Sequence, residues 1–451
     1  MTSNKSTRQH IVRLREKSIT QLWREPCLFA AAIFLSVILT SCGSHYMEGY
    51  MPHETNNRIE TNEPQGSDSI ASQNNSYKDT DEPATTQEPT STGEIASSPI
   101  STETSEPVST PTPEVANTAL PTETDVPTTP AQGDADESDD IVDPYVPYTY
   151  EHMIEDSLKL RDRYPEILSL DLIGYSVEGR DLTLIKLGKG EKKIILCASH
   201  HAREYITSSY LMKLTEQYAK IYSSQYDQNN YGDYNVKNLL DQITVYIVPM
   251  VNPDGVNLVI NGIDSVSNQE SVAAMAMIKK TYKEWKANIN GVDLNRQYPA
   301  QWAKKYDEIG KPASESFKGE SYATEPEVKA MMELSRDNDF ILSASFHTKG
   351  NVIFWADSAT VYLIPGAKEI TNRLSKLTKY KMMPISEKPE VYGAGYENWF
   401  RLEFLRPSFC IELTPSNNTD IPHDNKKFDT LVWNKAKYIG LFLADEALKC
   451  D

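Results

Sequence analysis

Two residues with metal-binding side chains, His201 and Glu204, follow an apolar run that is typical of a buried strand. The run is Ile195-Leu196-Cys197-Ala198, and a turn after it can direct both side chains at one metal ion. Zinc accepts imidazole nitrogen and carboxylate oxygen, and catalytic zinc sites use three protein ligands and a water. A His-x-x-Glu pair also occurs often by chance, so this pair alone does not establish a metal site.

A third ligand is available at the end of a second apolar run, where His347 follows residues 340–346. A lone histidine in that position is more often a packed, hydrogen-bonded residue than a ligand. Its place at a second strand end favours the metal hypothesis, because sites in open α/β sheets gather at the carboxyl ends of strands.

Two further segments carry polar side chains that suit peptide chemistry. Adjacent Asn295 and Arg296 can clamp a carboxylate, since the arginine fork binds it bidentately; the alternative is a surface arginine in an Asn-rich loop. Glu412 lies within the apolar run 408–413. Burying a carboxylate is costly, so we expect Glu412 to be paired or functional.

The elements expected to position these residues alternate between strands and helices. Short β-branched or apolar runs bounded by turn residues predict strands, and three- or four-residue apolar spacing predicts helices. The expected strands are Leu182–Leu187, Lys193–Ala198, Ile243–Pro249, Phe340–Phe346, Val352–Ala356 and Ser408–Leu413. The expected helices are Tyr150–Tyr164, Ser208–Tyr222, Glu325–Asn338, Val361–Thr378 and Asn425–Ala447. This alternation predicts an α/β fold with a layered sheet.

Charge divides the 451 residues into three segments. Residues 1–42 carry a net charge of +4, residues 43–143 carry −19 and residues 144–451 carry −4. The middle segment is rich in Ser, Thr, Pro and Glu, so we expect a disordered tether with a reach of roughly 50–60 Å. Residues 144–451 are expected to form one catalytic domain. No segment has the broad basic surface of a nucleic-acid-binding protein.

The first segment is typical of a secretory signal, with basic residues followed by a short apolar run from Leu28 to Leu39. The run ends in Leu39-Thr40-Ser41-Cys42, which resembles the bacterial lipobox. The resemblance implies lipidation of Cys42, and so an extracytoplasmic lipoprotein of a bacterium, held to the membrane by an N-terminal lipid anchor. The alternative is an uncleaved signal anchor.

Together, the motifs of residues 145–448 resemble the zinc carboxypeptidases of the carboxypeptidase A/B type. The family's ordered motifs have counterparts in His201-Ala202-Arg203-Glu204, Asn252-Pro253-Asp254-Gly255, Gly291-Val292-Asp293-Leu294-Asn295-Arg296, the strand-end His347 and the strand-borne Glu412. The resemblance implies a single-domain mixed β-sheet flanked by helices, here preceded by the disordered linker. It also implies one zinc ion and a peptide substrate.

The family's roles transfer to matching positions. His201, Glu204 and His347 would bind zinc, and Asp293 would orient a ligand histidine. Asn295 and Arg296 would hold the substrate's terminal carboxylate, and Arg203 would add positive charge to the cleft. Glu412 would be the general base and would then protonate the leaving amine.

Two positions depart from the family pattern. The oxyanion-stabilising arginine follows a tryptophan in the family, whereas Lys286 follows Trp285 here and lacks the planar fork. The mobile tyrosine precedes an Asp-Trp pair in the family. Here the pair is Asn398-Trp399 with a shorter interval, so Tyr392 is the first choice and Tyr396 the rival.

The sequence is compatible with two classes of substrate, ordinary peptides and muropeptides. Glu397 lies two residues before Trp399, near the point where members that prefer basic residues carry an acid, so it is a candidate for binding an amino group; an ordinary solvated carboxylate is the alternative. Residues 291–302 also resemble the bacterial branch that cuts γ-D-glutamyl-diamino acid bonds. The chain is therefore expected to be a metallocarboxypeptidase acting on peptides, or a hydrolase of muropeptides. A catalytically inactive peptide-binding lipoprotein is a third possibility, disfavoured by the intact zinc triad and Glu412.

Overall fold

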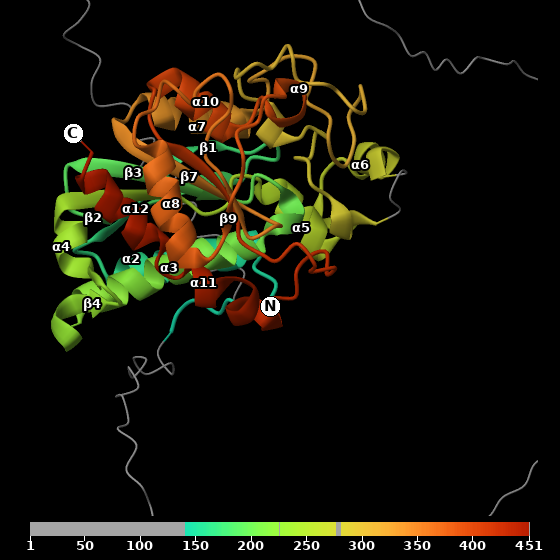
Figure 1. The fold of residues 1–451 in the computed structure, drawn as a ribbon. Coiled ribbons are helices and arrows are strands. Elements are labelled where there is room, and N and C mark those ends of the chain that lie inside the picture. Colours follow the sequence, from blue (N-terminus) through green and yellow to red (C-terminus); the bar gives the residue numbers. More distant parts are fainter. Residues whose placement is uncertain (1–139, 225, 277–280, 451) are drawn as a thin grey trace, which may run out of the picture. The chain divides into compact units, whose positions relative to one another are not determined.

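The computed structural model describes residues 140–224, 226–276 and 281–450 (Figure 1). The predicted signal segment, Cys42 and residues 43–139 of the predicted tether lie outside these residues. Near the start of the described part, Val142 is buried and its backbone N–H donates to Oε2 of Glu216 at 3.2 Å. Within the described ranges, no helix is both long and apolar enough to cross a membrane.

An eight-stranded mixed sheet forms the centre of this part of the chain, in the order β1-β2-β6-β3-β7-β10-β8-β9. Its strands are β1 (Leu168–Tyr175), β2 (Asp181–Gly188), β3 (Lys192–Ala198), β6 (Ile243–Val248), β7 (Phe340–His347), β8 (Val352–Phe354), β9 (Lys381–Met382) and β10 (Ser408–Glu412). Strands β6, β3, β7 and β10 run parallel, whereas β1, β2 and β8 join by antiparallel pairing. A small hairpin, β4 (Asn230–Tyr231) and β5 (Tyr234–Asn235), lies apart from this sheet.

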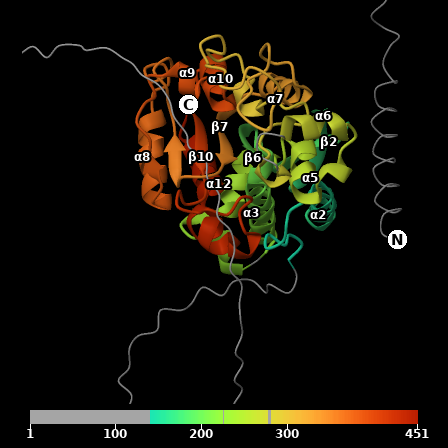
Figure 2. The ribbon, with the colours of Figure 1, turned by 90° about the vertical axis from the view of Figure 1, so that its right-hand side faces the viewer.

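Helices cover both faces of the sheet, with α7 and α10 above β7 and β10 in Figure 2 and α3 and α12 below. The α-helices are α2 (Tyr150–Arg163), α3 (Ile206–Ser223), α4 (Val236–Gln242), α5 (Pro253–Asn261), α6 (Gln269–Ala276), α7 (Pro326–Arg336), α8 (Ala367–Thr378), α9 (Pro389–Tyr392), α10 (Tyr396–Phe404), α11 (Asn434–Ala436) and α12 (Ile439–Leu448). Two short 3-10 helices, η2 (Ala202–Glu204) and η6 (Leu294–Arg296), carry site residues.

The central strands are apolar because helices cover both faces of the sheet. In β3, Ile194 and Leu196 pack into one hydrophobic cluster, while Ile195 and Cys197 pack into another. Successive side chains of a strand point to opposite faces, so a strand covered on both sides must be apolar at every position. The core therefore has two layers, one on each face of the sheet.

The predicted mixed sheet flanked by helices is confirmed, and all six expected strands are present. Strand β1 escaped sequence reasoning because it is an edge strand with several exposed residues and no regular alternation. The helix expected over Val361–Thr378 begins only at Ala367, since Pro365 precedes Gly366, whose φ of 83° is outside the helical region.

The helix expected over Asn425–Ala447 is wrong as one continuous element. It contains a 3-10 turn, a π-helical segment (Asp429–Trp433), α11 and α12. The hydroxyl of Tyr210 donates to the carbonyl of Ala436 at 3.0 Å, and that of Tyr218 donates to the carbonyl of Lys437 at 2.8 Å. These side chains take carbonyls that a continuous helix would pair internally.

The carboxyl ends of the four parallel strands bring the motif residues to one edge of the sheet. His201 follows β3 by three residues, and His347 is the last residue of β7. Glu412 is the last residue of β10 and pairs in register with His347. This shared edge positions side chains that are more than 200 residues apart in the chain.

Candidate metal centre

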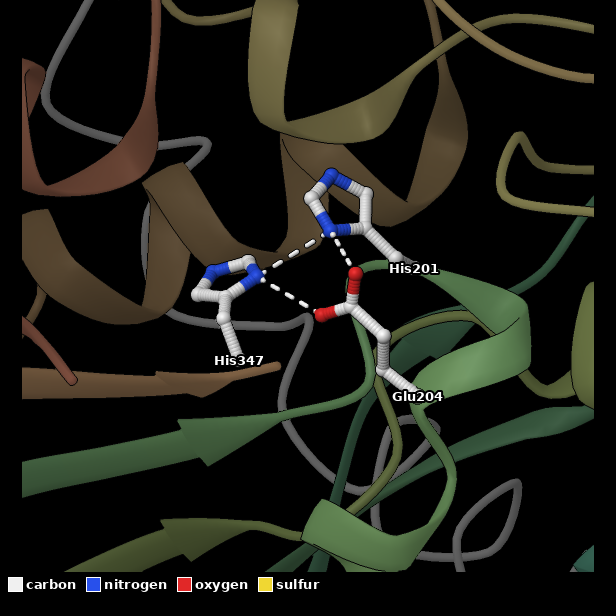
Figure 3. Close-up of side chains that lie close together, drawn as sticks. All are labelled: His201, Glu204 and His347. Carbon is white, nitrogen blue, oxygen red and sulfur yellow. Dashed lines mark hydrogen bonds and ion pairs between the residues drawn. The ribbon is translucent and has the colours of Figure 1, made fainter. Parts of the chain in front are cut away.

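Three buried side chains converge at this edge, as Figure 3 shows. Nδ1 of His201 lies 3.0 Å from Oε1 of Glu204, and Nδ1 of His347 lies 3.2 Å from Oε2 of the same carboxylate. The two Nδ1 atoms are 3.1 Å apart. The three residues can therefore present two imidazole nitrogens and a carboxylate oxygen to one ion, with the ligand atoms within 4.8 Å of one another.

Backbone hydrogen bonds to a distant segment fix the loop that carries His201 and Glu204. The N–H of Ala202 donates to the carbonyl of Lys286 at 3.1 Å, and that of Arg203 donates to the carbonyl of Trp285 at 3.0 Å. Gly255 of α5 lies against Ala202, because a Cβ added at Gly255 would stand 2.8 Å from the Ala202 Cβ. The first turn of α5 thus supports η2 from behind.

Asp293 determines which nitrogen of His201 is free. Its Oδ1 lies 3.1 Å from Nε2 of His201, and the neighbouring Lys286 and His201 hold the pKa of this carboxyl well below its usual range, against the effect of burial. An ionised carboxylate can only accept, so Nε2 carries the proton and Nδ1 keeps its lone pair. That lone pair points toward Glu204, so Nδ1 is the nitrogen that could bind a metal ion.

The charge balance of the cluster fits a cation. Burial works against a proton on His347, yet hydrogen bonding to Glu204 and then Glu397 raises its pKa to about 10. Burial also opposes the ionisation of Glu204, but the two histidines hold its pKa well below its ordinary value. The buried carboxylates of Glu204 and Glu397 are therefore stabilised by a positive charge between the two histidines. Two imidazole nitrogens with a carboxylate oxygen are a donor set that zinc prefers.

Glu412 stands beside the cluster with capacity to exchange a proton. Burial, together with the charge of Glu204, raises its pKa to about 8. Its Oε2 is buried and has no hydrogen-bond partner within the described part of the chain. A carboxyl that titrates near neutral pH and has a free oxygen is suited to general acid–base catalysis.

A cleft of about 180 Å³ opens beside these groups. Nine of the residues predicted from the sequence line it: His201, Glu204, Lys286, Asn295, Arg296, His347, Tyr392, Glu397 and Glu412. Tyr392 is 47% exposed, whereas its rival Tyr396 is fully buried with its hydroxyl 3.1 Å from that of Ser335. The cleft geometry thus favours Tyr392 as the mobile tyrosine.

Arg203 is the predicted cleft residue that the structure does not place with the others. Its Nη1 donates to Oε2 of Glu315 at 2.9 Å and to the carbonyl of Glu284 at 2.8 Å. The guanidinium therefore ties η2 to neighbouring loops, and it is absent from the lining of the cleft. Its positive charge is partly balanced by Glu315.

Sequence reasoning overlooked several residues of the site. Asp357 and Arg401 line the cleft, as does Asn398, which the sequence had marked only as part of the Asn398-Trp399 pair. The fully buried His200 lies behind the cleft, with Nε2 3.0 Å from the hydroxyl of Tyr298. Burial and the neighbouring His347 lower the pKa of His200 to about 3, so it is neutral at physiological pH. A usable signal existed for Arg401, because it stands four residues after Glu397 and so shares its helix face.

Comparison with known proteins agrees with this geometry. The family described as "Zinc carboxypeptidase" matches residues 154–415. Gamma-D-glutamyl-L-diamino acid endopeptidase 1 of Lysinibacillus sphaericus is 35% identical over 66% of this chain and 72% of its own. Carboxypeptidase B of Rattus norvegicus is 24% identical over 55% of this chain and 59% of its own. The crystal structure of thrombin activatable fibrinolysis inhibitor shares the fold, with a TM-score of 0.52 and 18% identity over 69% of this chain and 79% of that one.

Proposed function

The chain belongs to the zinc carboxypeptidase family and is a zinc metallopeptidase of that type; we propose that it hydrolyses the amide between a γ-D-glutamyl residue and a C-terminal diamino acid. Such bonds occur in the stem peptides of bacterial cell walls, so muropeptides are the proposed substrates. The proposal concerns the bond that is cut and the residue that is released.

The main support for this proposal is the buried, ionised carboxylate of Glu397 in the cleft. Glu397 lines the cleft, is 3% exposed and has its Oε1 atom 3.5 Å from Nε2 of His347. Burial opposes its ionisation, but His347 holds its pKa at about 2, so it is a carboxylate at neutral pH. A buried anion in the pocket for the released residue favours a side chain that ends in an amine. The named activity of the Lysinibacillus relative, whose substrate is a diamino acid peptide, supports the same assignment.

The catalytic groups of the chain can be assigned around the metal centre. His201, Glu204 and His347 would hold a zinc ion, which would supply Lewis acidity for the scissile carbonyl and for the activation of a water. Glu412 accepts the proton of the attacking water and returns it to the departing nitrogen, a double role that its pKa of about 8 permits.

Three further residues would hold the substrate. Nη1 of Arg296 donates to the carbonyl of Asn295 at 2.7 Å, and the remaining N–H groups of the guanidinium would donate to the terminal carboxylate. Asn295 accepts from the N–H of Tyr396 at 2.8 Å, which fixes its amide at the cleft wall. Lys286 lies 3.8 Å from Asp293 and lines the cleft, where its charge would stabilise the developing oxyanion.

A carboxypeptidase that removes lysine or arginine from ordinary peptides is the second candidate. Glu397 would bind those side chains as well, and carboxypeptidase B is among the similar proteins. The two candidates differ in the bond upstream of the released residue, not in the pocket that holds it.

A matched pair of peptides separates the candidates. The zinc-loaded full-length protein would be given L-Ala-γ-D-Glu-L-Lys and L-Ala-α-L-Glu-L-Lys, which differ at the glutamyl residue, with products identified by mass spectrometry. We expect release of lysine from the γ-D-glutamyl peptide and a rate at least about 100-fold lower for the other. Release from the α-L-glutamyl peptide alone would replace the first candidate with the second.

We also propose that the protein acts outside the cytoplasm as a lipoprotein, on the basis of its leader and Cys42. The substrate proposal is consistent with this location, because cell-wall peptides lie beyond the membrane. Labelling cells with radioactive palmitate should mark the wild-type protein and leave the Cys42→Ser variant unlabelled. Equal labelling of both would remove Cys42 as the lipidated residue.

A further inference from the structure

We propose that a second cavity, separate from the catalytic cleft, binds a saccharide of N-acetylhexosamine units. The cavity has a volume of about 470 Å³, within the range of roughly 300–1,000 Å³ that is usual for small-molecule sites. It lies between residues 140–145, helix α3 and the segment around α11, and none of its lining residues lines the cleft. The inference concerns a site of its own, so it does not depend on which bond the cleft cuts.

Aromatic rings form one wall of this cavity. The centroid of the Phe428 ring lies 6.2 Å from that of Tyr145 in an edge-to-face arrangement, and 6.0 Å from that of Trp433 in a stacked one. Phe428 is buried, whereas Tyr145 is 43% exposed and Trp433 is half-buried. The C–H groups of a pyranose ring pack on the negative face of an aromatic ring, so the two accessible rings suit a sugar.

The charged side chains around the cavity have partners within the protein. Nζ of Lys213 lies 2.5 Å from Oδ2 of Asp140 and 3.2 Å from Oε2 of the buried Glu216. Oδ2 of Asp429 accepts the hydroxyl of Tyr145 at 3.0 Å.

Two further charged residues of the lining are engaged in the same way. Nζ of Lys437 lies 5.7 Å from the ring centroid of Tyr231 and 5.4 Å from that of Tyr438, within reach of cation–π attraction. Oδ1 of Asp143 accepts the backbone N–H of Tyr145 at 2.9 Å. A charged ligand would have to compete with these contacts for a counter-charge, so the cavity favours a neutral polar molecule.

Three neutral polar groups at the cavity remain available to a ligand. Gln217, Trp433 and Asn434 line it, and neither the two side-chain amides nor the indole N–H makes a hydrogen bond with a described residue. A sugar hydroxyl can donate to an amide and accept from it, and an acetamido group can form two hydrogen bonds with one. An N-acetylhexosamine therefore supplies both the apolar face and the hydrogen-bonding groups that match this lining.

Buried polar groups hold the walls of the cavity in place. The carboxylate of Glu216 accepts the backbone N–H of Val142 at 3.2 Å. Nδ2 of the buried Asn425 donates to the carbonyl of Pro144 at 2.9 Å. Another part of the lining belongs to the π-helical segment Asp429–Trp433, a geometry found frequently at functional sites. The cavity is therefore formed before a ligand arrives, which lowers the entropic cost of binding.

Three disaccharides without a peptide test the inference by calorimetric titration of the full-length protein. N,N′-diacetylchitobiose and N-acetylglucosaminyl-N-acetylmuramic acid carry acetamido groups, whereas cellobiose has the same linkage without them. We expect the two acetylated sugars to bind with dissociation constants of about 1 mM or below, and cellobiose at least about tenfold more weakly. The tighter of the two acetylated sugars then identifies the source, a chitin-type chain or a cell-wall glycan. Binding of none of the three, or equal binding of all three, would overturn the inference.

A matched pair of glutamines locates the binding site. Gln217→Ala removes one available amide from the cavity and should weaken the binding of the acetylated sugars about tenfold. Gln269→Ala is the control, because Gln269 is an exposed glutamine of α6 outside the cavity, and this variant should bind them as the wild-type protein does. Circular dichroism verifies the fold of both.

Unchanged affinity in Gln217→Ala, or an equal loss in Gln269→Ala, would remove this cavity as the binding site. If Gln217→Ala fails to fold, Trp433→Phe takes its place, because it removes the indole N–H and retains an aromatic ring.

Discussion

Replacing Asp293 with asparagine removes one buried charge behind a metal ligand and leaves the shape of the side chain almost unchanged. Asp293 is 1% exposed, and its Oδ1 receives both Nε2–H of His201 and the backbone N–H of Asn295 at 3.1 Å. An asparagine oxygen can accept both bonds. What it cannot supply is the negative charge, and its amide group would face Lys286 Nζ, now 3.8 Å from Oδ2.

The expected loss follows from those contacts. Carboxylates behind ligand histidines contribute about 10–100-fold to metal affinity. The burial of Asp293 and the unfavourable approach of Lys286 place this variant near the upper end, at about 100-fold or ~2.7 kcal/mol. The dissociation constant for zinc, measured in competition with a chromophoric chelator, reports the effect directly, with circular dichroism to verify the fold.

Asp424→Asn is the matched control for this experiment. Asp424 also begins a 3-10 helix and accepts the N–H of the residue two positions on at 3.1 Å, but it pairs with Lys427 rather than with a histidine. The Asp424→Asn variant should bind zinc with the affinity of the wild-type protein. A change of less than threefold in Asp293→Asn, or an equal loss in the control, would refute the reasoning.

Three other variants probe catalysis, packing and charge. Glu412→Gln should lower kcat by about 10²–10⁴-fold while zinc content, measured by atomic absorption, stays at one ion, because Glu412 moves protons and binds no metal; unchanged kcat would remove it from the mechanism. Gly255→Ala should displace Ala202 and weaken zinc binding, since the new Cβ would stand 2.8 Å from the Ala202 Cβ; wild-type affinity would show that η2 tolerates the shift. Burial, with the charges of Asp254 and Glu325, raises the pKa of Glu327 from 4.5 to about 8. The fold therefore favours the protonated side chain, so the free energy of unfolding is highest below pH 4.5 and falls as the pH rises to about 8. Glu327→Gln should therefore gain up to about 4 kcal/mol on the wild-type protein between about pH 5 and pH 8, measured by urea unfolding, and a difference independent of pH would contradict a buried neutral Glu327.

Much of the metal centre could be predicted because its information is local. His201, His347 and Glu412 each stand at the end of an apolar run, and the ends of parallel strands meet at one edge whatever the loops between them do. The order of the motifs also identified the family. Strand β1 and the interruption before α12 could not be predicted, because an exposed edge and the hydroxyls of two tyrosines in another helix decide them.

The sequence by itself determined which residue types are available for zinc, for the general base and for the substrate carboxylate. Only the tertiary structure decided which charges remain free to act. Arg203 looked like a cleft residue from its motif, yet Glu315, 112 positions away, engages it. Arg401 drew no notice in the sequence, yet Asp357, 44 positions away, and the carbonyl of Ser408 hold its guanidinium beside the cleft. The free energy of a buried charge depends on every partner within a few ångströms, and those partners come from segments that no local pattern connects.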